Sequence, residues 1–126
     1  MGENLISGDG WAVATVDDLG DGPGFRKVRR ALGVTEFGVN AIVLPEGYQT
    51  GRHFHDRQQE LYFVHRGEIE FAFGDGTTHR LPAGGFARVD AATVRSLRNV
   101  GEGEAIYVCV GGQGGYVERD GHTADG

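Results

Sequence analysis

The chain contains a single cysteine, Cys109, and this excludes an internal disulfide as a source of stability. Cys109 lies within an apolar run, residues 105–110 (Ala-Ile-Tyr-Val-Cys-Val). A free cysteine in such surroundings behaves as a small apolar side chain. We therefore expect residues 105–110 to form a buried strand with the thiol in the core.

Long apolar runs are also missing. No stretch approaches the roughly 20 apolar residues that a membrane helix needs. The N-terminus, Met-Gly-Glu-Asn-Leu, lacks both the basic start and the long apolar core of a secretory signal. We expect a soluble, cytoplasmic protein with no membrane partner.

Basic charge is scarce. The 126 residues include 18 acidic and 12 basic side chains, a formal net charge of -6, which argues against a nucleic-acid partner. A short basic cluster, Arg-Lys-Val-Arg-Arg at residues 26–30, departs from this balance. We interpret residues 25–32 as a solvated, charged edge strand, a type of edge that discourages aggregation. The same strand could pair with another subunit.

Glycine is abundant, with 23 residues that fall where turns are expected. Between these turns lie short strand patterns. Residues 37–44 are apolar and β-branched, and residues 68–73 alternate, with Ile69, Phe71 and Phe73 on one face. The segment Gly-Asp-Gly at residues 74–76 is typical of a hairpin turn. Short strands at this density predict an all-β sandwich or barrel in one domain.

Three side chains between Gly47 and Gly67 have the chemistry of a metal site. His53 and His55 are two residues apart, so on a strand both imidazoles project from the same face. The polar residues 56–59 must turn the chain, after which Glu60 opens a second strand that we expect to lie beside the first. Two imidazoles and one carboxylate can then converge on one ion.

This stretch resembles the first signature of the cupin superfamily. That signature has a glycine, five residues, His-x-His, three or four residues, a glutamate, six residues and a glycine. All five fixed positions are filled here, by Gly47, His53, His55, Glu60 and Gly67. In the second signature a histidine precedes an asparagine by four residues. Asn99 matches the asparagine, but Arg95 stands in place of the histidine.

The resemblance covers roughly residues 37–111 and implies a double-stranded β-helix, the cupin jelly-roll barrel. We accordingly divide the chain into an N-terminal arm with one or two peripheral strands (1–35), a barrel (36–111) and a loosely held glycine-rich tail (112–126). The resemblance also implies a homodimer and a small-molecule site inside the barrel. The first ten residues look flexible, and residues 11–16 open the strand pattern.

Strand alternation predicts which side chains face that interior. If Glu60 points inward, Tyr62 does too, and if Asn99 points inward, so does Arg95. Arg95 would then occupy the place of the third imidazole. We expect Arg95 and Tyr62 to contact a ligand, and Phe71 and Phe73 are candidates for the wall of its pocket, although a plain core position is the favoured interpretation of both.

Arg95 weakens the case for a metal. A guanidinium has no lone pair to donate, so it cannot be a ligand. At about 5 Å and an effective dielectric constant of ~20, its charge repels a divalent ion by roughly 6 to 7 kcal/mol. Three alternatives stay open. His53, His55 and Glu60 hold an ion nevertheless; Arg95 pairs with Glu60 in a metal-free pocket for an anion; or the polar cluster is structural.

Two functions from different classes follow. As an enzyme, the protein would resemble metal-dependent cupins, which oxidise, isomerise or decarboxylate small organic acids or sugars, and it would use a divalent ion (Fe, Mn, Ni or Zn) on a small, anionic organic molecule. As a binding module, it would hold such a molecule without catalysis and without metal, with Arg95 as the anchor for the anion. Residue patterns alone do not identify the ligand.

Overall fold

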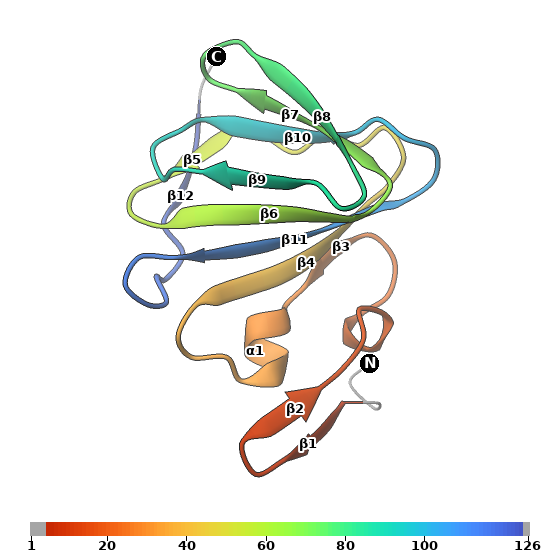
Figure 1. The fold of residues 1–126 in the computed structure, drawn as a ribbon, viewed down its shortest axis with the longest axis vertical. Helices are drawn as coiled ribbons and strands as arrows, with labels where there is room; N and C mark the ends of the chain where they lie inside the picture. The colour runs from red at the N-terminus through yellow and green to blue at the C-terminus, as the bar shows by residue number, and fades with distance from the viewer. Residues whose placement is uncertain (1–4, 125–126) are drawn as a thin grey trace.

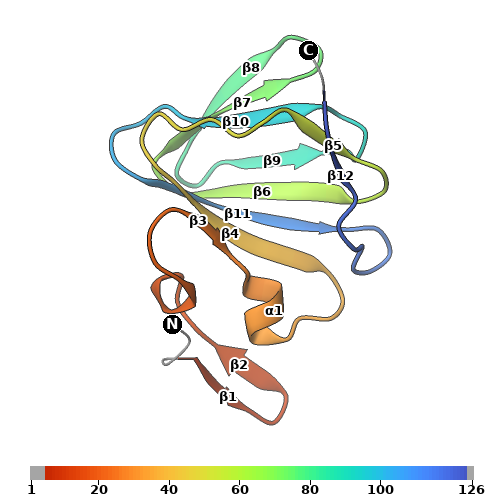
Figure 2. The same cartoon turned by 180° about the vertical axis from the view of Figure 1, so that it is seen from behind.

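The computed structural model describes residues 5–124, which fold into two facing five-stranded sheets (Figures 1 and 2). The first sheet has the order β12 (Gly121–Thr123), β5 (His53–His55), β10 (Arg95–Asn99), β7 (Glu68–Phe73), β8 (Thr78–Pro82). The second has the order β3 (Gly24–Arg26), β4 (Gly38–Leu44), β11 (Ala105–Gly112), β6 (Gln59–Arg66), β9 (Phe86–Val89). Every neighbouring pair is antiparallel, which confirms the all-β prediction.

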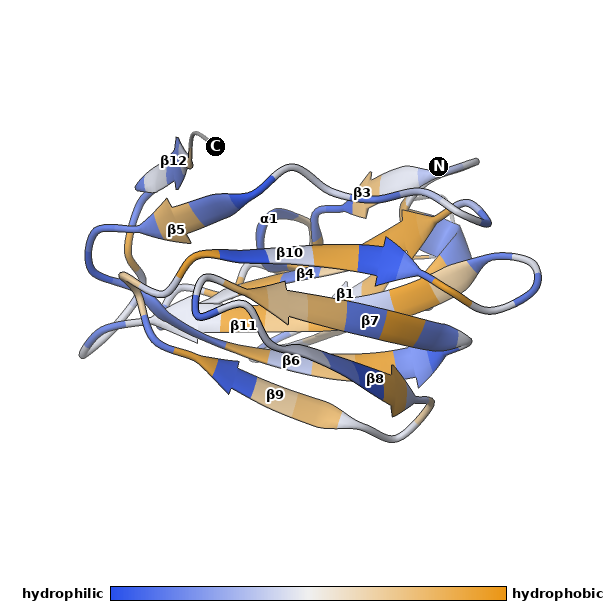
Figure 3. Cartoon of the chain, turned by 90° about the horizontal axis from the view of Figure 1, so that it is seen from above, coloured by the Kyte–Doolittle hydropathy of each residue, from blue (hydrophilic) through white to orange (hydrophobic). Residues whose placement is uncertain are grey.

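The core lies between the two sheets, where the inward faces of the strands meet (Figure 3). On β6 the alternation follows the prediction, with Tyr62 and Val64 buried and Leu61 exposed. Burying a side chain of this size contributes roughly 1.5–3 kcal/mol. The buried cluster consists of Ile42, Leu44, Tyr62, Val64, Ile69, Phe71, Val89, Leu97, Ala105 and Tyr107.

Asn99 joins the two sheets at one end of the core and is 2% exposed. Its amide nitrogen lies 3.1 Å from the carbonyl oxygens of both Leu44 and Pro45 and 2.9 Å from that of Gly103. Its side-chain oxygen accepts a hydrogen bond from the backbone N–H of Gly101. The asparagine therefore satisfies backbone groups of two loops that would otherwise be buried without partners.

The prediction of a charged strand over residues 25–32 is wrong for residues 28–32. The strand β3 ends at Arg26, and Val28–Leu32 form the short helix α1. The helix ends at Gly33, which adopts a left-handed conformation with φ of 75°. Glycine takes that conformation without the steric cost that other residues pay, so it commonly ends helices. Arg26 is also not solvated; it is 4% exposed and donates a hydrogen bond to the carbonyl oxygen of Gly22.

Both ends of the described chain contain a strand that was not predicted. Near the N-terminus, β1 (Ile6–Gly8) pairs with β2 (Trp11–Val13), and a 3₁₀ turn, η1 (Asp17–Leu19), follows. The flexibility predicted for the first ten residues stays a prediction, although residues 6–8 form a strand; residues 1–4 lie outside the described part. In the tail, Val117 is 4% exposed and β12 pairs with β5. The tail is part of the first sheet because its backbone completes the hydrogen bonds of an edge strand.

No helix within residues 5–124 is long and apolar enough to cross a membrane.

Candidate metal and ligand site

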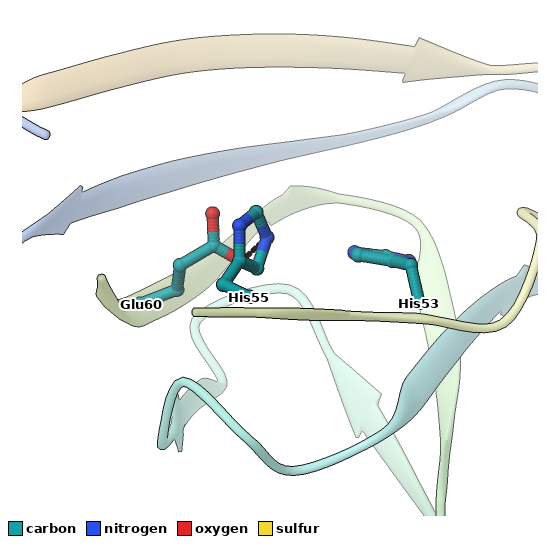
Figure 4. A group of neighbouring side chains, drawn as sticks. All are labelled: His53, His55 and Glu60. Atoms are coloured by element: carbon teal, nitrogen blue, oxygen red, sulfur yellow. Dashed lines mark ion pairs between the residues drawn. The ribbon is translucent and has the colours of Figure 1, made fainter. Parts of the chain in front are cut away.

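Three potential ligand side chains converge between the two sheets. His53 and His55 project from β5 of the first sheet, and Glu60 projects from β6 of the second (Figure 4). One ligand atom from each lies within 4.8 Å of the others. The two strands do not lie side by side as predicted, because residues 56–58 carry the chain from one sheet to the other. The predicted convergence of the three side chains nevertheless occurs.

Each histidine has one ring nitrogen bound to an acceptor. Nδ1 of His53 lies 3.1 Å from the carbonyl oxygen of Gly51, and Nδ1 of His55 lies 2.8 Å from Oδ1 of Asp120. Neither oxygen can donate, so in both rings Nδ1 carries the proton. In the neutral rings Nε2 therefore keeps its lone pair, and Nε2 of His55 lies 3.4 Å from Oε1 of Glu60.

The carboxylate of Glu60 is the centre of a buried cluster. Nη2 of Arg95 donates to its Oε1 at 2.7 Å, and the hydroxyl of Tyr62 donates to the same oxygen at 2.7 Å. Nε of Arg95 lies 3.3 Å from the Tyr62 hydroxyl. Two of the predicted ligand-contacting residues, Arg95 and Tyr62, thus hold Glu60 in place.

Arg95 is enclosed by the protein, with 0% of its side chain exposed. It stands opposite His53 in the pairing of β10 with β5, the position at which the third imidazole was expected. Its Nη1 donates to the carbonyl oxygen of Thr93 at 2.6 Å and lies 3.2 Å from that of Ala91. The guanidinium therefore binds both the loop before β10 and Glu60. The pair of Arg95 with Glu60 is the one that the metal-free alternative required.

Burial and these contacts shift the protonation of the site. Burial lowers the pKa of His53, and the Arg95 charge acts in the same direction. The contact with Glu60 raises the pKa of His55, and Asp120 raises it further. Burial alone would raise the pKa of Glu60, but the contact with His55 and the hydrogen bonds from Tyr62 and Arg95 outweigh burial and lower the pKa to about 2. Glu60 is therefore ionised at neutral pH.

The aromatic residues predicted for the pocket wall pack beside this cluster. Phe71 is 1% exposed, and its ring centroid lies 5.4 Å from that of Tyr62 in an edge-to-face arrangement. Phe73 is partly buried and stacks on Phe71 with centroids 6.3 Å apart. Cys109 is also partly buried and packs on the core from β11; burial, and then Glu60, raises the pKa of its thiol.

One residue of the site was not found from the sequence. Asp120 contacts His55 although the two are 65 positions apart, and its side chain is 9% exposed. It lies in a glycine-rich stretch with no recognisable motif, and β12 is three residues long. Only the pairing of β12 with β5 brings it to the site, so no local signal could have identified it.

A hollow of about 220 Å³ borders the site on one side. It is lined by Glu60 but by neither histidine, and Phe37, Leu61 and Arg88 contribute to its wall. The glycine-rich residues 111–115 complete it. Of the three predicted metal ligands, Glu60 therefore borders this hollow.

Comparison with known proteins agrees with this architecture. The cupin domain family matches residues 40–111, more than half of the chain. A comparison with curated proteins finds no match. Among solved structures, an uncharacterized conserved protein with a double-stranded beta-helix domain from Klebsiella pneumoniae is 24% identical with a TM-score of 0.75, covering 90% of this chain and 97% of that one.

Two further solved structures share the fold. A sugar phosphate isomerase of the cupin superfamily from Silicibacter pomeroyi is 22% identical with a TM-score of 0.69, covering 93% of this chain and 67% of that one. A cupin protein from Bacteroides fragilis is 21% identical with a TM-score of 0.67, covering 93% and 91%. The chain therefore belongs to the cupin superfamily, as the residues between Gly47 and Gly67 indicated.

Proposed function

We propose that His53, His55 and Glu60 hold a divalent metal ion and that this site takes a small, anionic organic ligand. The observation that carries the proposal is the convergence of the three ligand atoms within 4.8 Å. The bonds from Nδ1 of both rings to fixed acceptors support it, because each leaves Nε2 free to coordinate. Iron, manganese, nickel and zinc all accept imidazole with carboxylate, so the donor set fits this group of ions.

The position of Arg95 is compatible with an ion and favours an anionic ligand. The hydrogen bonds from Arg95 and Tyr62 to Glu60 both end on Oε1, so they leave Oε2 of the carboxylate without either donor. Arg95 carries one positive charge, and Glu60 and Asp120 carry two negative charges, so a divalent ion would leave an excess of one positive charge in a site with few solvent contacts. A small carboxylate or phosphate would offset that excess.

The enzymatic form of the proposal assigns each residue a separate role. The ion would supply Lewis acidity or bind oxygen. Glu60 and the two histidines would hold it, while Tyr62 and Arg95 keep the Glu60 carboxylate ionised and oriented. The sugar phosphate isomerase among the solved structures acts on an anionic substrate class, which supports isomerisation of a phosphorylated or carboxylated small molecule.

A metal-free binding function is the second candidate. The bond of 2.7 Å between Arg95 and Glu60 favours it, because Arg95 already neutralises the carboxylate that an ion would need. With 0% of its side chain exposed, Arg95 could bind an anion only if this ion pair opened. Such a protein would store or sense a small anion without catalysis.

Metal content separates the two candidates. Untagged protein would be analysed by elemental mass spectrometry as purified and again after incubation with Fe²⁺, Mn²⁺, Ni²⁺ or Zn²⁺ and removal of excess ion. We expect near-stoichiometric metal in the wild type and its loss in His53→Ala. His65→Ala is the matched control, since His65 is exposed on the outward face of β6.

A wild-type protein that stays free of metal after all four incubations would refute the metal site and leave the metal-free candidate. Equal metal content in His53→Ala and the wild type would mean that the ion is bound elsewhere. Metal retained by the wild type and by His65→Ala, but not by His53→Ala, would make catalysis on anionic substrates the next assay.

A further inference from the structure

We propose that Asp120, the residue directly before the C-terminal strand β12, is a positioning residue for His55. It would hold the His55 ring so that Nε2, and not Nδ1, is presented toward Glu60. This inference rests on the proposed metal site, and it adds to that site a residue from outside the segment matched by the family, which ends at residue 111.

The carboxylate of Asp120 is fixed by four donors. Oδ1 accepts from Nδ1–H of His55 at 2.8 Å and from the side-chain amide of Gln58 at 2.7 Å. Oδ2 accepts from the backbone N–H groups of Arg57 at 2.7 Å and Gln58 at 3.2 Å. With its side chain 9% exposed, the carboxylate has little freedom to leave this position.

The backbone of β12 also limits the orientation of the ring. Gly121 stands opposite His55 in the pairing of β12 with β5. A Cβ atom at Gly121 would lie 3.3 Å from Cε1 of His55, closer than such contacts normally are. The ring therefore packs directly on the glycine, while Asp120 holds its Nδ1 edge.

Metal-bound histidines are commonly oriented in this way by a carboxylate on their second nitrogen. The hydrogen bond selects the tautomer, sets the direction of the free lone pair and increases the basicity of the ring. Loss of such a partner typically weakens metal affinity by about 10- to 100-fold. We expect a loss of this size when Asp120 is removed.

The same pair of strands offers a matched control. Oδ2 of Asp56 bonds to Nε2 of His122 on β12 at 2.8 Å, so this is also a carboxylate and histidine pair that links the tail to residues next to β5. It is exposed, with 58% of Asp56 and 50% of His122 accessible to solvent. Asp56→Ala therefore removes a comparable tail contact without touching His55.

The experiment compares Asp120→Ala, Asp56→Ala and the wild type. Zn²⁺ affinity is measured by competition with a chromophoric chelator. The ¹⁵N shifts of the His55 ring are measured in metal-free protein at a pH at which the ring is neutral. In the wild type and in Asp56→Ala we expect the proton on Nδ1 and unchanged affinity. In Asp120→Ala we expect the proton to populate Nε2 and Zn²⁺ binding to weaken by about 10- to 100-fold.

Detachment of the tail could also weaken binding, so it is measured separately. The N–H of Ala124 donates to the carbonyl oxygen of Arg52, and its hydrogen exchange reports whether β12 is in place. If Asp120→Ala loses this protection, Asp120→Asn serves instead, because it keeps the shape of the side chain. The amide of this variant keeps one oxygen that can accept from His55, but it cannot accept from all four donors. We therefore expect Zn²⁺ affinity to fall in Asp120→Asn as well, by less than in Asp120→Ala.

Unchanged Zn²⁺ affinity in both Asp120 variants, or an Nδ1-protonated ring in Asp120→Ala with β12 in place, would overturn the positioning role. An equal loss of affinity in Asp56→Ala would overturn it as well, since any tail contact would then suffice. A wild-type protein that binds no Zn²⁺ would refute the proposed metal site. The ring shifts would still show whether Asp120 orients His55.

Discussion

At the scale of single residues, Arg95 links the Glu60 carboxylate to the loop that precedes β10. Its Nη2 donates to Glu60, and its Nη1 donates to the carbonyl oxygen of Thr93. A buried charge of this kind is costly unless its partners remain, and loss of one partner leaves the other uncompensated. Arg95 therefore acts in opposite directions on the stability of the metal-free fold and on the affinity for a cation.

Replacing Arg95 with methionine should show both effects. We expect Arg95→Met to lose about 3–5 kcal/mol of unfolding free energy in urea with a chelator present, because Glu60 is left buried and unpaired. We also expect Zn²⁺ to bind at least about tenfold more tightly, since a repulsive charge is gone. Arg98→Met is the control: Arg98 is 47% exposed on the same strand, and its ion pair with Glu70 should contribute about 0–1 kcal/mol. Weaker Zn²⁺ binding in Arg95→Met would contradict the repulsion.

Glu60 should contribute a pH-dependent part of the stability. Its pKa in the folded, metal-free protein is about 2, below the ordinary value of 4.5. Ionised Glu60 contributes its full stabilisation of the fold above pH 4.5, and this contribution is lost as the pH falls toward 2. The shift corresponds to about 3 kcal/mol. In urea unfolding with a chelator, the stability difference between the wild type and Glu60→Gln should shrink by about this amount from pH 5 to pH 2. A difference that does not change with pH would show that Glu60 is not stabilised as an anion.

At the scale of elements, the turn between β6 and β7 depends on Gly67, the last fixed position of the signature. Its φ is +83°, and a Cβ atom there would lie 2.9 Å from Cβ of Ala105. Gly76, in the hairpin between β7 and β8, has a similar φ of +88° but open space around it. The two glycines therefore separate the cost of the backbone conformation from the cost of a collision.

Alanine at these two positions should destabilise the protein unequally. Gly76→Ala should cost about 1–2 kcal/mol, the cost of a left-handed conformation. Gly67→Ala should cost at least about 1 kcal/mol more, because Ala105 must also move. Urea unfolding of both variants measures the difference. Equal losses of unfolding free energy in the two variants would mean that the strands accommodate the contact with Ala105 without cost.

The elements also show which sequence signals were informative. Alternation in β6 and β7 correctly predicted the inward faces, because a strand between core and solvent must alternate. Residues 28–32 were misjudged as strand from their charges, although Ala31, Leu32 and Gly33 form a typical helix end. Short elements of this kind depend on their surroundings more than on propensity.

At the scale of the whole molecule, the homodimer implied by the cupin resemblance stays a prediction. The strand β3 is an edge of the second sheet, and Phe25 on this strand is 61% exposed. Trp11 and Ile6 of the neighbouring N-terminal arm are 55% and 59% exposed. An edge strand with exposed apolar side chains is suited to pairing with a second copy of the chain.

Sedimentation velocity tests this edge. We expect the wild type to sediment as a dimer and Phe25→Ser to shift toward monomer. Phe86→Ser is the control, because Phe86 is 62% exposed on β9, the opposite edge of the same sheet. Dissociation in the Phe86 variant alone would place the interface at β9, and a monomeric wild type would refute the dimer.

The amino-acid sequence was sufficient for the fold family and for three residues of the site. Glycine spacing and strand alternation are local properties, so the signature from Gly47 to Gly67 indicated the cupin fold and brought His53, His55 and Glu60 together. Only the tertiary structure showed that Arg95 is buried in an ion pair with Glu60 and that Asp120 binds Nδ1 of His55. These contacts join residues 35 and 65 positions apart. They arise from the facing of two sheets and the pairing of a three-residue strand, and neither leaves a periodic pattern in the chain.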